Sequence, residues 1–198
     1  MIMGSRETIL QAIALNKPDL AELPEVDISI TSHYNDVVRQ FGAMIEAAGG
    51  SVFNMNSIQT LLNEISAIKE DGKFVINLFG DSDIDQLKGL NAENLEELDT
   101  CYLLAQLGVA ENGALWVSEK QMFNRLIPFI CQHLVIVLNP KNIVSNMHEA
   151  YNQINAASDG FGVFIAGPSK TADIEQNLVI GAHGARSLRV CLMDLVDS

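Results

Sequence analysis

The run Leu134-Val135-Ile136-Val137-Leu138 is highly informative about the fold, because five apolar residues follow one another with no polar interruption. A strand with one wet face alternates apolar and polar side chains, whereas this run is apolar at every position. The pattern predicts a strand that is buried on both faces, which is typical of a parallel sheet covered by helices. Residues 74–78 (FVINL) are a second predicted strand of this kind.

Helical and strand patterns alternate on both sides of this run. Helices are predicted at residues 32–48, 57–68, 143–155 and 171–180, with a short one near 93–98. Further strands are predicted at residues 51–54, 102–109, 114–117, 162–166 and 188–192, and a turn at 110–113 separates two of them. This alternation indicates an α/β fold with a mostly parallel sheet flanked by helices. In such sheets ligands bind beyond the carboxyl ends of the strands.

Residues 1–30 are predicted to form an N-terminal helical arm and linker that precede an α/β domain at residues 31–198. Residues 5–16 fit a helix, capped by Ser5, in which Ile9, Leu10 and Ile13 make an apolar stripe. Two prolines and several acids in residues 17–26 indicate a linker. The sequence leaves open whether the helix packs on its own domain or on a partner subunit, so it allows a homo-oligomer.

The composition predicts a globular protein with a large core, since 48% of the 198 residues are apolar and 19% are charged. A formal net charge of −13 disfavours nucleic acid and anionic membrane surfaces as partners, although it permits a local cationic pocket. No apolar run approaches the roughly 20 residues that span a bilayer. The first 15 residues lack a signal-peptide pattern. We therefore expect a soluble, cytoplasmic protein without membrane insertion.

The three cysteines, Cys101, Cys131 and Cys191, are far apart and each lies in an apolar run. This placement predicts buried free thiols in a reducing cytosol. No His, Cys or carboxylate pair has the spacing of metal ligands, and no cysteine cluster signals an iron–sulfur centre. No GxGxxG follows a strand. We therefore predict no metal site and no cofactor in this chain.

Residues 167–175 (GPSKTADIE) are the first segment that could carry chemistry. A strand runs into Gly167, and a helix is predicted to open near Thr171. Unpaired backbone N–H groups at a helix N-terminus, beside Ser169 and Lys170, would cradle a small anion. The same segment also fits simple capping, with Ser169 or Thr171 as N-cap and Asp173 and Glu175 as first-turn acids.

Two further segments carry candidate functional groups. In residues 181–186 (GAHGAR), His183 could act as an acid or base near neutral pH, and Gly184 would let the backbone approach a ligand closely. Arg186 could bind a carboxylate or phosphate, although the segment also fits a helix C-cap turn. In residues 108–113 (GVAENG), Glu111 could be a functional carboxylate or could merely cap the turn that Asn112-Gly113 signals.

Taken in order, E-N-G at 111–113, G-P-S-K-T-A-D-I-E-Q at 167–176 and G-A-H-G-A-R at 181–186 resemble the LUD-domain family, whose short members are the lactate-utilisation protein C (LutC/YkgG-like) group. The resemblance covers residues 101–192 and extends back to about residue 31. The matched positions are Glu111, Gly113, Gly167, Pro168, Ser169, Thr171, Asp173, Glu175, His183, Gly184 and Arg186. The family usually has threonine where this chain has Asn112 and Ala114, and often proline at Ala185. No hydroxyl at position 112 or 114 is therefore expected to bind ligand.

The resemblance implies a NagB/RpiA/CoA-transferase-like fold and support of L-lactate oxidation to pyruvate, alongside an iron–sulfur partner protein and a second partner. We expect Glu111 and His183 to be catalytic. Ligand binding is expected from Gly167, Ser169, Lys170, Thr171, Asp173, Glu175, Gly184 and Arg186. One hypothesis makes the chain a component of a lactate-oxidising system that binds a small anion. The alternative is a stand-alone enzyme of the CoA-transferase/phosphosugar-isomerase-like superfamily with Glu111 as nucleophile.

Overall fold

The computed structural model describes residues 4–19, 21–22, 24, 27–79, 87, 89–155, 160–172, 178–180 and 184–195. Its larger sheet has the strand order β1-β11-β6-β3-β2, and every neighbouring pair is parallel. The strands are β1 Ser51–Asn54, β2 Val75–Asn77, β3 Thr100–Leu104, β6 His133–Leu138 and β11 Ser187–Leu192. The predicted α/β fold with a mostly parallel sheet is confirmed.

Strand β6 occupies the middle of this sheet, and its side chains enter two different cores. Leu134, Ile136 and Leu138 belong to the larger hydrophobic cluster, whereas Val135 and Val137 belong to the cluster on the opposite face. Both faces of the strand are therefore buried. This is why the sequence is apolar at every position of the run.

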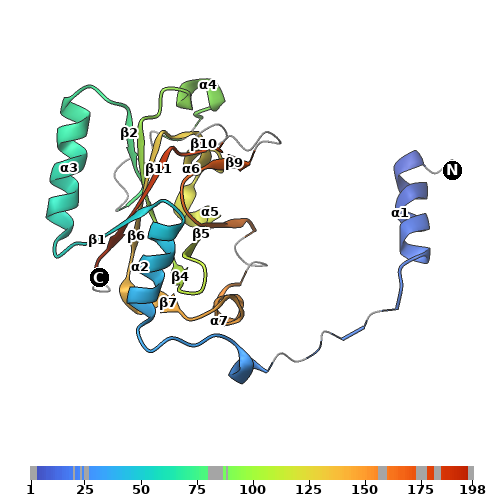
Figure 1. Cartoon of the computed structure of the whole chain (residues 1–198). Helices are drawn as coiled ribbons and strands as arrows, with labels where there is room; N and C mark the ends of the chain where they lie inside the picture. The colour runs from blue at the N-terminus through green and yellow to red at the C-terminus, as the bar shows by residue number, and fades with distance from the viewer. Residues whose placement is uncertain are drawn as a thin grey trace.

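Helices α2 (Val37–Ala47) and α3 (Ile58–Glu70) cover opposite faces of the parallel sheet (Figure 1). The buried residues of α2 join the larger cluster, and those of α3 join the other. Ser57 caps α3, as predicted, by accepting a hydrogen bond from Gln59 N at 3.1 Å. Helix α2 begins later than predicted, because the Asp36 carboxylate caps it. The shorter helices are α4 Ala92–Leu95, α5 Glu119–Met122, α6 Ile127–Ile130, α7 Met147–Gln153, and the 3-10 turns η1 Ile28–Ile30 and η3 Pro140–Asn142.

A second sheet, which the sequence did not predict, packs beside α2. Its order is β7-β4-β5-β8, with β7 and β4 parallel and the other pairs antiparallel. The strands are β4 Leu107–Val109, β5 Ala114–Ser118, β7 Ile143–Val144 and β8 Gly162–Ile165. Leu115 and Val117 face the larger cluster, whereas Trp116 and Val109 face α7. The layers therefore run α3, parallel sheet, α2 with the second sheet, and α7.

Two predicted elements differ because the chain changes sheet. The predicted strand at 102–109 is two strands, since Ala105 N donates to Val137 O in the parallel sheet and Gln106 N donates to Trp116 O in the second sheet. The predicted helix at 143–155 begins only at Met147. The β-branched Ile143 and Val144 instead pair with β4 as strand β7.

The predicted helix at residues 171–180 is wrong. Strands β9 (Lys170–Ala172) and β10 (Leu178–Ile180) pair antiparallel, with Thr171 opposite Val179. The sequence pattern of hydroxyl residues followed by acids is typical of a helix start, but the segment also contains β-branched residues, which favour strands.

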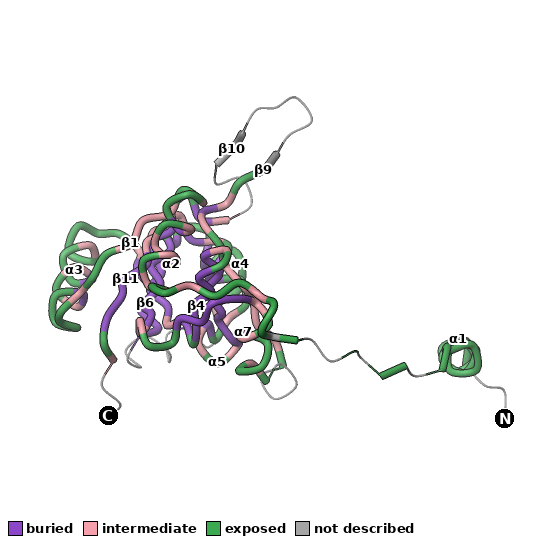
Figure 2. The backbone as a smooth tube through the Cα atoms, turned by 60° about the horizontal axis from the view of Figure 1, so that its bottom comes forward, coloured by how far each residue is buried: buried purple, intermediate pink, exposed green. Residues whose placement is uncertain are grey.

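Helix α1 (Ser5–Leu15) stands apart from the rest of the molecule (Figures 1 and 2). It matches the predicted helix, although Gly4 rather than Ser5 is its N-cap residue. No residue of α1 is buried. Within the part of the chain that the structure describes, no helix combines the length and apolar character needed to cross a membrane.

Candidate functional site

The loop after β8 turns sharply over the end of α2. Gly167 has φ +81°, and a Cβ atom there would stand 2.8 Å from Ala48 O. Only glycine fits, because an L side chain is strained at this φ and would also overlap the helix backbone. The chain then returns toward the parallel sheet, where Ser169 N donates to Ala185 O at 2.8 Å.

The E-N-G turn rests on the same helix. Gly113 has φ +71°, and a Cβ there would lie 3.0 Å from Ile45 N. The turn is closed by hydrogen bonds from Gly113 N to Val109 O at 2.9 Å and from Ala114 N to Asn112 Oδ1 at 3.0 Å. Since Leu115 pairs with Ile165, this turn and the Gly167 loop lie at the same end of the second sheet. The predicted turn at residues 110–113 is confirmed.

Gly184 connects the third segment to the first, since a Cβ at Gly184 would stand 3.1 Å from Ser169 Cβ. Gly167, Ser169 and Gly184 line one cavity of 170 Å³. Its other lining residues are mostly apolar: Pro128, Phe129, Leu134, Phe164, Ile165, Pro168, Ala185 and Leu188. The structure thus brings the backbone of the 167–169 and 184–185 segments together around a small space.

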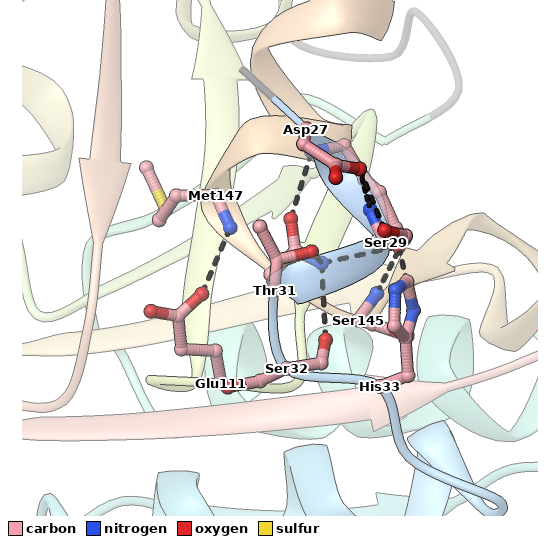
Figure 3. Close-up of polar contacts among 10 residues, drawn as sticks. Asp27, Ser29, Thr31, Ser32, His33, Glu111, Ser145 and Met147 are labelled. Atoms are coloured by element: carbon pink, nitrogen blue, oxygen red, sulfur yellow. Dashed lines mark hydrogen bonds and ion pairs between the residues drawn. The ribbon is translucent and has the colours of Figure 1, made fainter.

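Three predicted side chains do not line this cavity. Lys170 is exposed, with its Nζ beside Gly49 at the end of α2. Arg186 is also exposed, and its backbone N–H donates to Gln132 O at 2.8 Å. Glu111 is exposed and points to α7, where its Oε2 accepts a hydrogen bond from Met147 N at 3.0 Å (Figure 3). The carboxylate therefore caps a helix N-terminus in this structure.

The structure describes little of the remaining predicted site residues. Thr171 is in β9, and its side chain is not described. Asp173, Glu175 and His183 lie outside the described residues. Because Lys170–Ala172 is a strand, the expected cradle of helix N-terminal amides does not form, and Ser169 N already has a partner. A binding role for these residues stays a prediction.

The cavity also lies at the opposite edge of the parallel sheet from the one expected. Gly184–Arg186 leads into the amino end of β11, and Pro128–Phe129 precedes the amino end of β6. Strand β8, which leads into Gly167, belongs to the second sheet and runs antiparallel to β5. The rule that ligands bind beyond the carboxyl ends of parallel strands therefore does not point to this loop.

A larger cavity of 540 Å³ lies where β3 and β6 end, and the sequence interpretation missed it. Its polar lining consists of carboxamides: Gln106, Asn139, Asn142, Gln153 and Asn155. Asn139 is committed to structure, since its Oδ1 accepts from Lys141 N and its Nδ2 donates to Leu195 O. The signal that could have found this cavity is Asn139-Pro140 directly after the buried LVIVL strand.

The N-terminus of α7 forms a hydrogen-bonded cluster with residues 31–33 (Figure 3). The buried Asn146 side chain donates to Thr31 Oγ1 and Ser32 O, each at 3.0 Å, and its Oδ1 accepts from Glu149 N at 3.0 Å. His33 Nδ1 lies 3.3 Å from Glu149 Oε1. These contacts attach the start of the domain to the layer farthest from α3.

The prediction that the three cysteines are buried free thiols is confirmed. Cys101, Cys131 and Cys191 are all buried and free. Among the residues that the structure describes, no group of three or more His, Cys, Asp or Glu side chains is placed to hold a metal ion.

Comparisons with known proteins agree with the motif order. The LUD domain family model matches residues 31–193. Lactate utilization protein C of Bacillus pumilus is 33% identical over 82 residues, which are 38% of this chain and 34% of that protein. Lactate utilization protein C of Geobacillus thermodenitrificans is 28% identical over 100 residues, which are 48% of this chain and 42% of that protein. The chain thus spans less than half the length of these relatives.

Two further similarities extend over most of the chain. An uncharacterized protein of Neisseria meningitidis is 24% identical over 218 aligned positions, covering 94% of this chain and 92% of that protein. The crystal structure of a DUF162 family protein from Deinococcus radiodurans superposes with a TM-score of 0.61 at 13% identity, covering 82% of this chain and 99% of that chain. The structural likeness shows the fold alone. With the family model matching residues 31–193 and all three motif segments inside that range, the chain belongs to the LUD domain family.

Proposed function

We propose that this chain is a cytoplasmic component of a system that oxidises L-lactate to pyruvate, in which it binds a small anionic ligand and acts with an iron–sulfur partner protein. The observation that carries the proposal is the LUD domain match over residues 31–193, which includes every motif segment. The relatives named lactate utilization protein C support the physiological role. Their partial coverage makes the role a proposal for this chain.

The chemistry explains why a partner is needed. Converting lactate to pyruvate removes two electrons and two protons from the C2 carbon and its hydroxyl group. The electrons require an acceptor, and we assign that role to the iron–sulfur partner. The residues of this chain would bind and orient a carboxylate rather than accept electrons.

The small cavity fits a small ligand. Its 170 Å³ is below the roughly 300–1,000 Å³ of pockets that take drug-sized molecules. Ser169 lines the cavity, and Lys170 and Arg186 follow directly after its two lining segments in the sequence. We propose that on ligand binding the exposed Lys170 and Arg186 side chains turn toward the cavity, where cationic groups would suit a carboxylate in an otherwise acidic protein. Gly167 and Gly184 let the backbone approach, and Thr171, Asp173, Glu175 and His183 complete the proposed site.

Growth on L-lactate tests the physiological role. A deletion strain of the source organism should fail to grow on L-lactate as sole carbon source and should grow normally on pyruvate. The wild-type gene should restore growth, and affinity purification of the chain should recover an iron–sulfur protein. Normal growth of the deletion strain on L-lactate would contradict the role.

Calorimetry with L-lactate as the probe tests the site. Arg186→Ala should weaken binding by about 1.5–3 kcal/mol, the scale of a charged hydrogen bond. The control is Arg39→Ala, which removes another exposed arginine from α2. Equal affinities for wild type and Arg186→Ala would remove Arg186 from the site.

The alternative in which Glu111 is a nucleophile has no specific support among the described residues. A nucleophilic carboxylate needs a dry pocket lined with donors. Glu111 is exposed, and one of its oxygens is hydrogen-bonded to Met147 N. The absence of a Glu111 adduct after incubation with acyl-CoA thioesters would agree with this view.

A further inference from the structure

Among the described residues, α3 is the one helix on one face of the parallel sheet, where Met55, Met193 and Leu195 also pack against the cluster. The hydrophobic cluster on this face contains side chains from α3, whereas the opposite face packs against α2 and the second sheet. Five strands about 4.8 Å apart make a sheet roughly 20–24 Å wide, and one helix covers about 10 Å. Helix α3 therefore covers about half of the face.

The exposed part of this face is at the edge strand β1, because Cys191 of the neighbouring strand β11 is already buried in the cluster under α3. Ser51 pairs with Arg189 and Phe53 with Cys191, so these side chains share the α3 face. Phe53 is 52% exposed. Two adjoining cavities of 350 and 170 Å³ share Phe53, Glu64 and Arg189 in their linings. Together they form a groove beside α3 that extends from Phe53 in β1 to Thr100 and His133 at the amino ends of β3 and β6, and we call it the α3 groove.

The floor of the α3 groove is ordered by a polar cluster. Glu64 accepts hydrogen bonds from Arg189 and from the Tyr102 hydroxyl, the latter at 3.0 Å. Burial, with the neighbouring Glu64 carboxylate, raises the pKa of Tyr102. The cluster holds the Arg189 guanidinium at Glu64, and Arg189 lines both cavities together with Phe53, which gives the groove a fixed, partly apolar floor.

Helix α1 is the matching unpartnered element. Ile9, Leu10 and Ile13 are 57%, 50% and 53% exposed and lie on one stripe of the helix. A helix of 11 residues is shorter than the roughly 12–15 residues at which isolated helices become even marginally stable in water. A surface that buries the stripe would stabilise α1. At about 1.5 Å per residue the helix is roughly 16 Å long, close to the length of β11.

We propose that α1 of one copy packs into the α3 groove of a second copy, in a reciprocal dimer that exchanges the two helices. The chain after α1 is attached at Thr31 and Ser32 to the α7 layer, on the opposite side of the body from α3 (Figure 1). A body of this size has a radius of about 20 Å, so the path around it is about 60 Å. The 15 residues from Asn16 to Thr31 reach at most about 54 Å when fully extended. The groove of a facing copy is accessible without that detour, and a reciprocal exchange is a closed two-fold arrangement.

Sedimentation of the full chain tests the proposal. The wild type should have twice the 21.6-kDa chain mass at micromolar concentration. Ile9→Asp combined with Ile13→Asp should reduce the mass to that of one chain. Leu15→Asp is the matched control, since Leu15 is 85% exposed on the other side of α1, and it should leave the dimer intact.

The receiving surface is tested separately. Phe53→Asp should also give a monomer, whereas Leu126→Asp, at an exposed apolar position elsewhere, should not. The variants in α1 change only exposed residues, so they test the proposal even if Phe53→Asp fails to fold. A wild type that is monomeric throughout, or a dimer that survives either the α1 double variant or a folded Phe53→Asp variant, would overturn the proposal.

Cross-linking distinguishes exchange from packing within one chain. Ile13→Cys and Phe53→Cys proteins are prepared separately, mixed and treated with a short bismaleimide. The native cysteines are buried, so each protein offers one reactive thiol. Exchange predicts a mixed cross-linked dimer that neither protein gives alone. An intramolecular cross-link in the double variant, with no mixed dimer, would show that α1 packs on its own body.

Discussion

Gly113 and Gly167 place two chain segments against the same turn of α2. At both positions φ is positive, and at both a Cβ would lie within 3.0 Å of the helix backbone. Because both positions are glycine, both segments can pack directly against the backbone at the end of α2. The sequence predicted the Gly113 turn, because Asn-Gly signals turns locally, but not the contact with α2, because that depends on packing between distant segments.

Gly167→Ala should lower the free energy of unfolding by about 3 kcal/mol, combining left-handed strain with overlap against Ala48 O. Gly72→Ala is the matched control, since Gly72 has φ +79° but nothing within 4 Å of the added Cβ. It should cost only about 1 kcal/mol. Urea unfolding of both variants measures the difference. Equal costs would show that close approach to α2 does not constrain the loop.

A structural role of Glu111 can be distinguished from a functional role by experiment. If it only caps α7, Glu111→Gln should keep growth on L-lactate and cost about 0.3–1 kcal/mol of stability, the range for a charge at a helix N-terminus. Thermal unfolding and growth of the complemented deletion strain measure the two effects. Loss of growth in a variant with near-native stability would restore Glu111 as a catalytic candidate.

The three thiols should be unreactive in the folded protein. Burial raises the pKa of Cys131 to about 12, and it also raises the pKa values of Cys101 and Cys191. Because the thiolate is the reactive form, raising the pKa lowers reactivity at pH 8. Ellman's reagent should modify none of the three in the native state and all three in denaturant. Native modification at the rate of free cysteine would contradict the packing.

At the scale of elements, the sequence predicted best where the local signal and the packing agree. The buried run of β6 and the Ser57 cap of α3 are of this kind. The helix expected at 171–180 failed because a capping pattern is only a local preference, whereas pairing of Thr171 with Val179 requires another segment. The second sheet was not predicted for the same reason, since β4 is stabilised by hydrogen bonds to a partner strand on each side.

Asn146 is the residue that links α7 to the start of the domain. Asn146→Ala removes the α7 cap and the two hydrogen bonds that the Asn146 side chain donates to Thr31 Oγ1 and Ser32 O, so it should cost about 3 kcal/mol. Ser57→Ala, which removes the α3 cap without a tertiary contact, should cost about 1 kcal/mol. Chemical denaturation compares them. Hydrogen exchange should also accelerate at residues 31–33 only in the Asn146 variant; equal effects would deny the link.

At the scale of the whole molecule, the sequence predicted the fold class but only part of the site. Parallel strands and their flanking helices follow from periodicity, which each segment carries by itself. The cavity at Ser169 and Gly184 requires the second sheet, because that sheet brings β8 back to the amino edge of the parallel sheet. The carboxamide cavity at the opposite edge requires the bend between β3 and β4. Neither arrangement has a local signature.

A titration with L-lactate, followed through the amide resonances in NMR, tests the proposed carboxylate site most directly. If the small cavity binds L-lactate, the backbone amides of Gly167, Ser169 and Gly184, which surround it, should show saturable shifts. The side-chain amides of Gln106, Asn142 and Gln153 in the larger cavity should not move. Saturable shifts confined to those carboxamides, or no saturable shift at millimolar L-lactate, would contradict the proposed carboxylate site.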